Sequence, residues 1–283
     1  MLCRLVLTAA LALGACSQPQ SADPALWRID GAGGARGYLF GTVHALPRPA
    51  LWRTAAVDRA LAESDRIVVE VADMADATAM AETFERLAHS PGQPPLSQRV
   101  APALRGRLAA ALARAGTRDD QFGDVETWAA ALTLARAEDD ARGTANGIDR
   151  AVIGAADGRP VLELEGARVQ LGIFDHLPEP DQRQLLAAVI TDADHPESSS
   201  AAEAWRKGDM ARIERETRRG MLADPELRAA LFIRRNQAWA ARVAAMLGAG
   251  EHPFVAVGSA HMAGPEGLPA LLAARGFRVT RIE

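Results

Sequence analysis

Residues 37–44 read GYLFGTVH, and residues 254–261 read FVAVGSAH. Each stretch is an apolar run that ends in a glycine, a hydroxyl residue, one spacer and a histidine, so each predicts a buried strand followed by a G-x-x-H segment. Ligands of α/β sheets bind beyond the carboxyl ends of the strands, where loops present side chains from a rigid support. One G-x-x-H carries little information, but its repetition at two strand ends does. We therefore expect His44 and His261 to face one site.

Further strand-like and helical patterns define the fold class. Strands are predicted at 26–30, 67–71, 161–165 and 277–281, and the turn at 31–34 predicts a hairpin between the first of them and the strand near residue 38. Helical spacing dominates at about 51–64, 74–140, 167–247 and 268–274. This order predicts an α/β (α+β) fold, with a central mixed sheet built from two G-x-x-H halves and large helical insertions. We expect a single domain over residues 25–283.

Composition excludes several functional classes. The chain has 283 residues and a net charge of −4, so no global positive field is present to attract nucleic acid. Lys207 is the only lysine, which disfavours Schiff-base and P-loop chemistry.

The N-terminus has the pattern of an export signal. Arg4 precedes an apolar run at 5–15 that is too short to span a bilayer, which needs about 20 residues. Leu13-Gly14-Ala15-Cys16 resembles a bacterial lipobox, which implies removal of residues 1–15 and lipidation of Cys16, and Ser17 is typical of outer-membrane lipoproteins. Residues 16–24 then form a tether, and the domain faces the periplasm. The alternative is an ordinary secretory signal that happens to end beside a cysteine.

Buried carboxylates are the next candidates for chemistry. Glu70 lies in an apolar strand, where an ionised carboxylate needs a metal, a hydrogen-bond donor or an ion-pair partner such as Arg235. Glu165 ends another strand. Two neutral imidazoles and a carboxylate suit a divalent ion (Mn, Co, Zn or Fe), and a second carboxylate then serves as general base. The candidate ligands are His44, His261 and Glu70, and the candidate catalytic residues are Glu70, Glu165 and Arg235. We interpret His89, His176, His195 and His252 as solvent-facing loop residues.

Several blocks together resemble the TraB/GumN family, which is similar to the Tiki metalloproteases. They span about residues 26–283 and comprise LFGTVH at 39–44, residues 60–70, VLELE at 161–165 with Gln170, Trp205 with Gly208-Asp209, Arg235-Asn236 with Trp239, and FVAVGSAHMAG at 254–264. The resemblance implies a core of two G-x-x-H halves, and its Tiki-like members are metal-dependent proteases, which maps roles onto His44, Glu70 and His261. One departure is Gly166, where the family more often has a small hydroxyl residue.

Three functions remain open at this point. The first is a lipid-anchored, metal-dependent hydrolase of the cell envelope, acting as a peptidase on an envelope protein or peptide. The second is a non-catalytic binding lipoprotein of the same fold, associated with the envelope or with exopolysaccharide. The third is an esterase-like or haem-binding use of the paired histidines.

Overall fold

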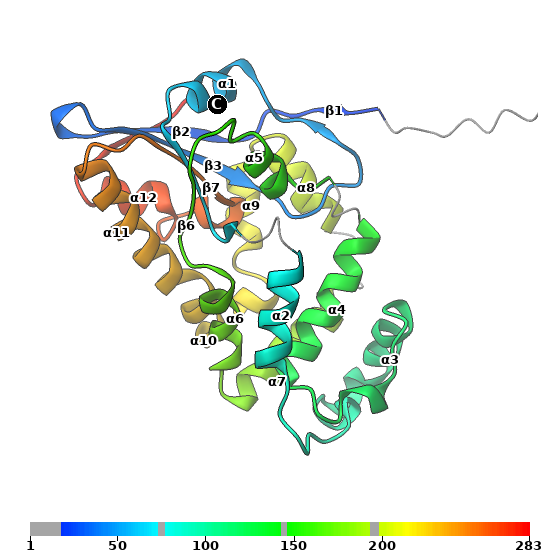
Figure 1. Cartoon of the computed structure of the whole chain (residues 1–283). Coiled ribbons are helices and arrows are strands. Elements are labelled where there is room, and N and C mark those ends of the chain that lie inside the picture. The colour runs from blue at the N-terminus through cyan, green and yellow to red at the C-terminus, as the bar shows by residue number, and fades with distance from the viewer. Residues whose placement is uncertain (1–17, 73–76, 143–145, 193–197) are drawn as a thin grey trace, which may run out of the picture.

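A six-stranded mixed sheet forms the centre of the protein, in the order β6-β5-β7-β3-β2-β8 (Figure 1). The computed structural model describes residues 18–72, 77–142, 146–192 and 198–283. The sheet strands are β2 (Leu26–Asp30), β3 (Arg36–Thr42), β5 (Arg66–Val69), β6 (Val161–Glu163), β7 (Pro253–Gly258) and β8 (Arg278–Arg281). The predicted α/β class with a mixed sheet and helical insertions is confirmed.

The two G-x-x-H strands are neighbours in this sheet. β3 pairs in parallel with β7, and β5 pairs in parallel with both β7 and β6, so these four strands end at the same edge. β2 pairs antiparallel with β3 and with β8, which confirms the predicted hairpin. The four parallel strand ends therefore meet at one edge, as a ligand site in such a sheet requires.

Apolar side chains alternate between the two faces of the sheet, and helices cover both. From β7, Val255 and Val257 pack toward α11 (Arg234–Gly248) and α12 (Leu268–Ala273), whereas Phe254 and Ala256 pack toward α1 (Ala55–Ala62) and α5 (Ile148–Gly154). Figure 1 shows the sheet between these two helix pairs.

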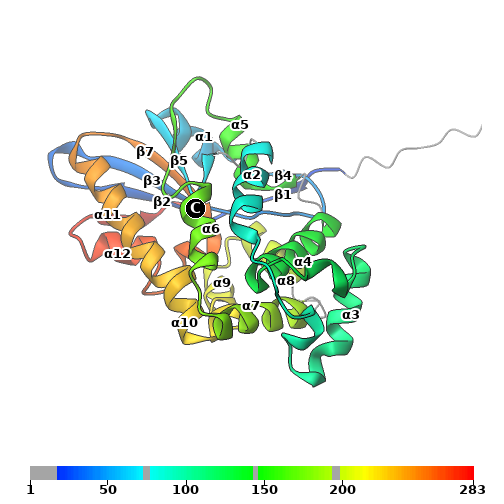
Figure 2. The ribbon, with the colours of Figure 1, turned by 60° about the horizontal axis from the view of Figure 1, so that its bottom comes forward.

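The helical insertions build a second core away from the sheet (Figure 2). Its centre is Trp128, which is fully buried. The helices around it are α2 (Ala77–Ala88), α3 (Arg105–Arg114), α4 (Thr127–Arg142), α6 (Ala167–Asp175), α7 (Glu179–Asp192) and α10 (Pro225–Arg228). The remaining helices of the second insertion are α8 (Ser198–Arg206) and α9 (Met210–Glu216), followed after α10 by a π-helical segment at Ala229–Ile233.

Several boundaries differ from the sequence expectation. The strands expected at 67–71 and 161–165 end at Val69 and Glu163, so Glu70 and Glu165 follow their strands instead of lying in them. The first insertion extends beyond residue 140 to include α5, whose seven residues are too few to show a helical period. The helix expected at 51–64 begins at Ala55, because the Thr54 hydroxyl accepts from the Val57 amide over 3.2 Å and caps it.

The segment predicted as a tether is in part bound to the domain. Gln20–Ser21 forms strand β1, which pairs with β4 (Ala50–Leu51). Cys16 and the signal sequence lie outside the described residues. Within the described part of the chain, no helix combines the length and apolar character needed to cross a bilayer.

Candidate functional site

The two G-x-x-H segments leave the same edge of the sheet, offset by one residue. In the β3–β7 register, Thr42 lies opposite Gly258, so Gly41 and Gly258 are not direct partners. His261 is carried by a short 3-10 turn, Ser259–Met262, that follows β7 directly. Both imidazoles interact electrostatically with the carboxylate of Glu70. The structure thus brings His44, His261 and Glu70 to one region.

Each motif glycine permits a close contact. A Cβ on Gly41 would lie 3.0 Å from Cβ and 3.1 Å from Cα of Ser259, because the turn that carries His261 crosses β3 at this point. A Cβ on Gly258 would lie 3.3 Å from Oε1 of Glu70. The glycine of each G-x-x-H therefore makes room for the other half of the site.

Glu70 follows β5 and is held at both carboxylate oxygens. Oε1 accepts from the Gly258 amide at 2.8 Å, and Oε2 accepts from Arg235 at 2.9 Å and from Gln170 at 3.2 Å. Burial alone raises the pKa of Glu70, but its electrostatic interactions with His261, Arg235 and His44 and the Gly258 hydrogen bond outweigh burial and lower it. Glu70 is therefore ionised at neutral pH, and the ion-pair partner expected from the sequence is Arg235.

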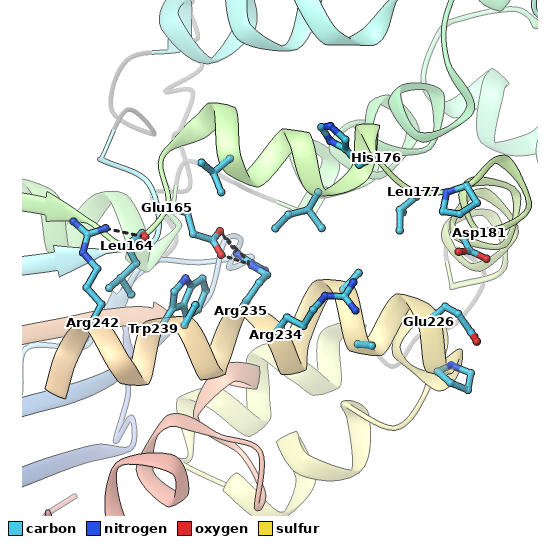
Figure 3. Close-up of a pocket in the computed structure, with 17 residues that line it drawn as sticks. Leu164, Glu165, His176, Leu177, Asp181, Glu226, Arg234, Arg235, Trp239 and Arg242 are labelled. Carbon is cyan, nitrogen blue, oxygen red and sulfur yellow. Dashed lines mark hydrogen bonds and ion pairs between the residues drawn. The ribbon is translucent and has the colours of Figure 1, made fainter. Parts of the chain in front are cut away.

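Arg235 joins two carboxylates. Besides Glu70, its Nε and Nη2 donate to Glu165 at 2.9 and 3.0 Å, and its guanidinium lies 4.6 Å above the Trp239 ring (Figure 3). Glu165 is brought beside Glu70 because its amide donates to the Glu70 carbonyl at 3.1 Å. The three predicted catalytic residues thus form one buried Glu–Arg–Glu cluster.

Gly166, the departure from the family pattern, has a local cause. Its φ of 83° lies in the left-handed region, and a Cβ there would lie 2.6 Å from Oε1 of Glu163. A side chain at position 166 would conflict with both the backbone and Glu163.

The His261 ring is fixed in one orientation. Its Nδ1 lies 2.6 Å from Oδ1 of Asn236, and Nδ2 of Asn236 donates to the Glu266 carbonyl, so the amide oxygen faces the ring and Nδ1 carries the hydrogen. Nε2 is then the acceptor nitrogen, 3.4 Å from Nη1 of Arg235. Burial lowers the pKa of His261 to about 4, so the ring is neutral at pH 7.

His44 has a matching anchor on the other strand. Its Nδ1 lies 2.9 Å from Oδ2 of Asp149, near the start of α5, and Thr42 donates to the second oxygen of that carboxylate. Burial raises the pKa of Asp149, but the charge and hydrogen bond of His44 and the hydrogen bond of Thr42 lower it by more, so the net pKa is below the usual value. Asp149 is thus ionised and buried, whereas the His44 side chain is 57% exposed.

Sequence reasoning assigned no role to Asp149 or Asn236. Both anchor a histidine through Nδ1, an arrangement typical of metal-ligating and catalytic imidazoles. The available signals were Thr42, a buried hydroxyl that needs a partner, and the position of Asn236 next to Arg235 in a block shared with the family.

The types of side chain at the site suit a divalent ion, because two histidines have anchored Nδ1 atoms and a carboxylate lies near them. In the described ranges, however, no three His, Cys, Asp or Glu side chains are grouped to hold a metal ion. Arg235 lies against both Glu70 and His261, so a metal shared by the predicted ligands requires its guanidinium to move aside.

A groove of about 720 Å³ opens beside the Glu–Arg–Glu cluster (Figure 3). It lies between α6 on one side and α10 with α11 on the other, and Glu165 and Arg235 contribute to its wall. This groove gives the cluster access to a ligand much larger than water.

Comparison with known families agrees with this arrangement. The sequence profile of the TraB/PrgY/gumN family matches residues 25–281, nearly the whole chain. The chain belongs to the TraB/PrgY/gumN family. No curated protein and no solved structure matches it significantly.

The other histidines of this TraB/PrgY/gumN-family chain lie apart from the strand-end cluster. His89 and His176 are exposed, with side-chain exposures of 44% and 84%, as expected from the sequence. His252, also expected to face solvent, is half-buried, and its Nδ1 lies 3.2 Å from the Arg36 carbonyl. His176 lines part of the groove. His195 lies outside the described residues.

Proposed function

We propose that this TraB/PrgY/gumN-family chain is a lipid-anchored, metal-dependent hydrolase of the bacterial cell envelope that cleaves peptide bonds. The observation that carries the proposal is the paired anchoring of the two strand-end histidines. Asp149 and Asn236 each hold an Nδ1, which makes both Nε2 atoms the acceptor nitrogens, beside an ionised Glu70. Imidazoles oriented in this way serve as metal ligands or as bases.

Charge balance also supports a cation at the site. Glu70, Glu165 and Asp149 are three carboxylates, of which the guanidinium of Arg235 offsets one and the charge of His44 beside Asp149 offsets a second, while His261 is neutral. Uncompensated buried charge is costly, so a divalent cation on His44, His261 and Glu70 would be favourable. Bound there, such an ion would polarise the scissile carbonyl and activate a water.

The residues themselves supply the remaining roles. Glu165 holds Arg235 through two hydrogen bonds, and Arg235 stands where a cation can stabilise an oxyanion. Glu165 becomes a general base only when this pair opens. In the closed arrangement it is therefore a positioning residue.

One observation favours the non-catalytic alternative. Both oxygens of Glu70 already have hydrogen-bond donors, so the Glu–Arg–Glu cluster is complete as a structural ion pair. In that case the groove binds a ligand, and the protein catalyses no reaction on it.

Metal analysis separates the two functions. The chain is extracted in detergent and purified without a histidine tag, its content of Mn, Co, Zn and Fe is measured, and hydrolysis of an unfolded protein is followed with each ion added. The test variants are His44→Ala and His261→Ala. The control is His252→Ala, which removes a half-buried histidine at the opposite end of β7.

We expect wild type and His252→Ala to bind metal and hydrolyse, and both site variants to lose metal and activity. A folded wild type that neither binds nor responds to any of the four ions overturns the hydrolase proposal in favour of the binding protein.

A further inference from the structure

The groove beside Arg235 has unpaired charge of opposite sign at different positions along its length. Arg234 makes no hydrogen bond or ion pair with the described residues, and neither do the carboxylates of Asp181 and Glu226. Figure 3 shows the Arg234 side chain between the Glu165–Arg235 pair and the end of the groove where Asp181 and Glu226 lie. The groove therefore attracts an anionic group near the cluster and a cationic group at its far end.

The rest of the groove wall is mainly apolar. Leu164, Ile173, Ala230 and Trp239 contribute to it, and Val169 on α6 is 56% exposed. Burial of this apolar side chain under a ligand would be favourable, because removing apolar surface from water lowers the free energy.

The dimensions match a short extended chain. The groove follows residues 225–242, which at 1.5 Å per residue extend over about 25 Å. An extended peptide rises about 3.3 Å per residue, so about seven residues fill this length.

We propose that this groove binds an extended peptide segment with apolar side chains, an anionic group at Arg234 and a cationic group at Asp181 and Glu226. The inference rests on the proposed hydrolase function, for which it names the substrate class. The groove reaches Glu165 and Arg235, which contact Glu70, so a bound segment lies against the proposed reaction site.

The pair of opposite charges favours a peptide over a lipid. An anionic lipid places its charge at one end of its apolar chains and has nothing to match Asp181 and Glu226. A peptide carries either sign at any position, and complementary charges select partners mainly by penalising the wrong sign.

Binding of labelled synthetic peptides tests the inference. Four otherwise apolar seven-residue peptides differ at two positions four residues apart, about 13 Å in an extended chain and close to the spacing of Arg234 and Glu226: one Lys and one Glu, two Lys, two Glu, or two Gln. Fluorescence anisotropy is measured with the purified full chain carrying His44→Ala, which prevents the proposed cleavage during the titration.

Three variants are compared in that background. Arg234→Glu reverses the positive position, Val169→Asp places a charge on the apolar rim, and Leu51→Asp is the matched control because Leu51 is 61% exposed and absent from the groove.

We expect the Lys/Glu peptide to bind best, and Arg234→Glu to weaken it about tenfold while improving the two-Lys peptide. Val169→Asp should weaken the binding of all four peptides, and Leu51→Asp should weaken the binding of none of them. A merely structural role for Arg234 would lower every affinity without inverting the preference.

Two results overturn the inference: equal affinity for all four peptides, or no peptide binding together with flotation on phosphatidylglycerol vesicles that Val169→Asp abolishes. Failure of the hydrolase proposal is a separate result. If wild type never hydrolyses but the charge preference and its inversion are observed, the groove is a peptide site without the proposed chemistry.

Discussion

Nη2 of Arg235 donates to Oε2 of Glu70 over 2.9 Å, and both side chains are almost fully buried. This contact joins the end of a central strand to the first turn of α11, across a sequence separation of 165 residues. Because Arg235 also holds Glu165, one guanidinium compensates two carboxylates. Changes at the three residues should therefore have unequal effects on stability.

Arg235→Ala should destabilise the protein more than Glu70→Gln. Removing the arginine leaves two buried carboxylates without their cation, and breaking a buried pair costs about 3–5 kcal/mol. Glu70→Gln leaves Arg235 paired with Glu165, so we expect the free energy of unfolding to fall by only about 1–3 kcal/mol. Urea unfolding measures both, with Arg53→Ala, from an exposed ion pair with Asp58, as a control that changes little. A larger loss for Glu70→Gln would contradict the shared-cation interpretation.

Stability should fall as the pH is lowered from about 6.5 to 4, in part because of His261. The unfolded chain protonates this histidine near its ordinary pKa of 6.5, whereas burial keeps the folded pKa at about 4. The unfolded state binds more protons in this window, so acid favours unfolding, by at most about 3 kcal/mol. Thermal unfolding of wild type and His261→Gln across this range isolates the effect, because the variant should lose less stability. If the stability of wild type and of His261→Gln falls equally with pH, the contribution of His261 is contradicted.

Gly41→Ala should lower the free energy of unfolding by about 1–3 kcal/mol, because the new Cβ meets the backbone of Ser259, which cannot rotate away. Gly258→Ala should cost less, because its nearest neighbour is the end of the Glu70 side chain. Gly106→Ala is the control: no atom lies within 4 Å, and alanine favours the helix. Chemical denaturation gives the order, and equal losses at positions 41 and 258 would be inconsistent with the close approach of Ser259.

The sheet and the two histidines could be predicted because the information is local. The run Phe254–Val257 is apolar without interruption, and the glycine and histidine after it repeat the pattern at Gly41 and His44. The pairing of Glu70 with Arg235 was also accessible, because a carboxylate in an apolar strand requires a partner.

Other features depend on contacts between distant residues or on subtle backbone geometry. Asp149 meets His44 at a separation of 105 residues, from a helix too short to show a period. The π-helical turn at Ala229–Ile233, which precedes Arg235, has no distinctive residues. The charge pattern of the groove arises only when α7, which carries Asp181, packs beside α10 and α11, which carry Glu226 and Arg234.

Cys16→Ser should release the protein from the membrane. The apolar run before Cys16 is too short to span a bilayer, and stable anchoring requires two acyl chains or more. Fractionation after a salt wash should find wild type in the membrane pellet and Cys16→Ser in the soluble periplasmic fraction. Ser17→Asp should remain membrane-bound but move to the inner membrane. A Cys16→Ser protein that stays in the washed pellet shows that the anchor is not this cysteine.

Asp149→Asn should weaken metal binding about 10–100-fold, as is typical when a residue that orients a histidine ligand is lost. The amide still fills the space, but the charge that holds Nδ1 of His44 is removed, and the ring no longer has one preferred tautomer. Competition with a chelator measures the affinity, and urea unfolding of the same samples checks the fold. Asp58→Asn, at an exposed ion pair, should leave both quantities unchanged. If Asp149→Asn lowers stability while the metal affinity stays at the wild-type value, Asp149 supports the fold through Thr42 and His44 is not a metal ligand.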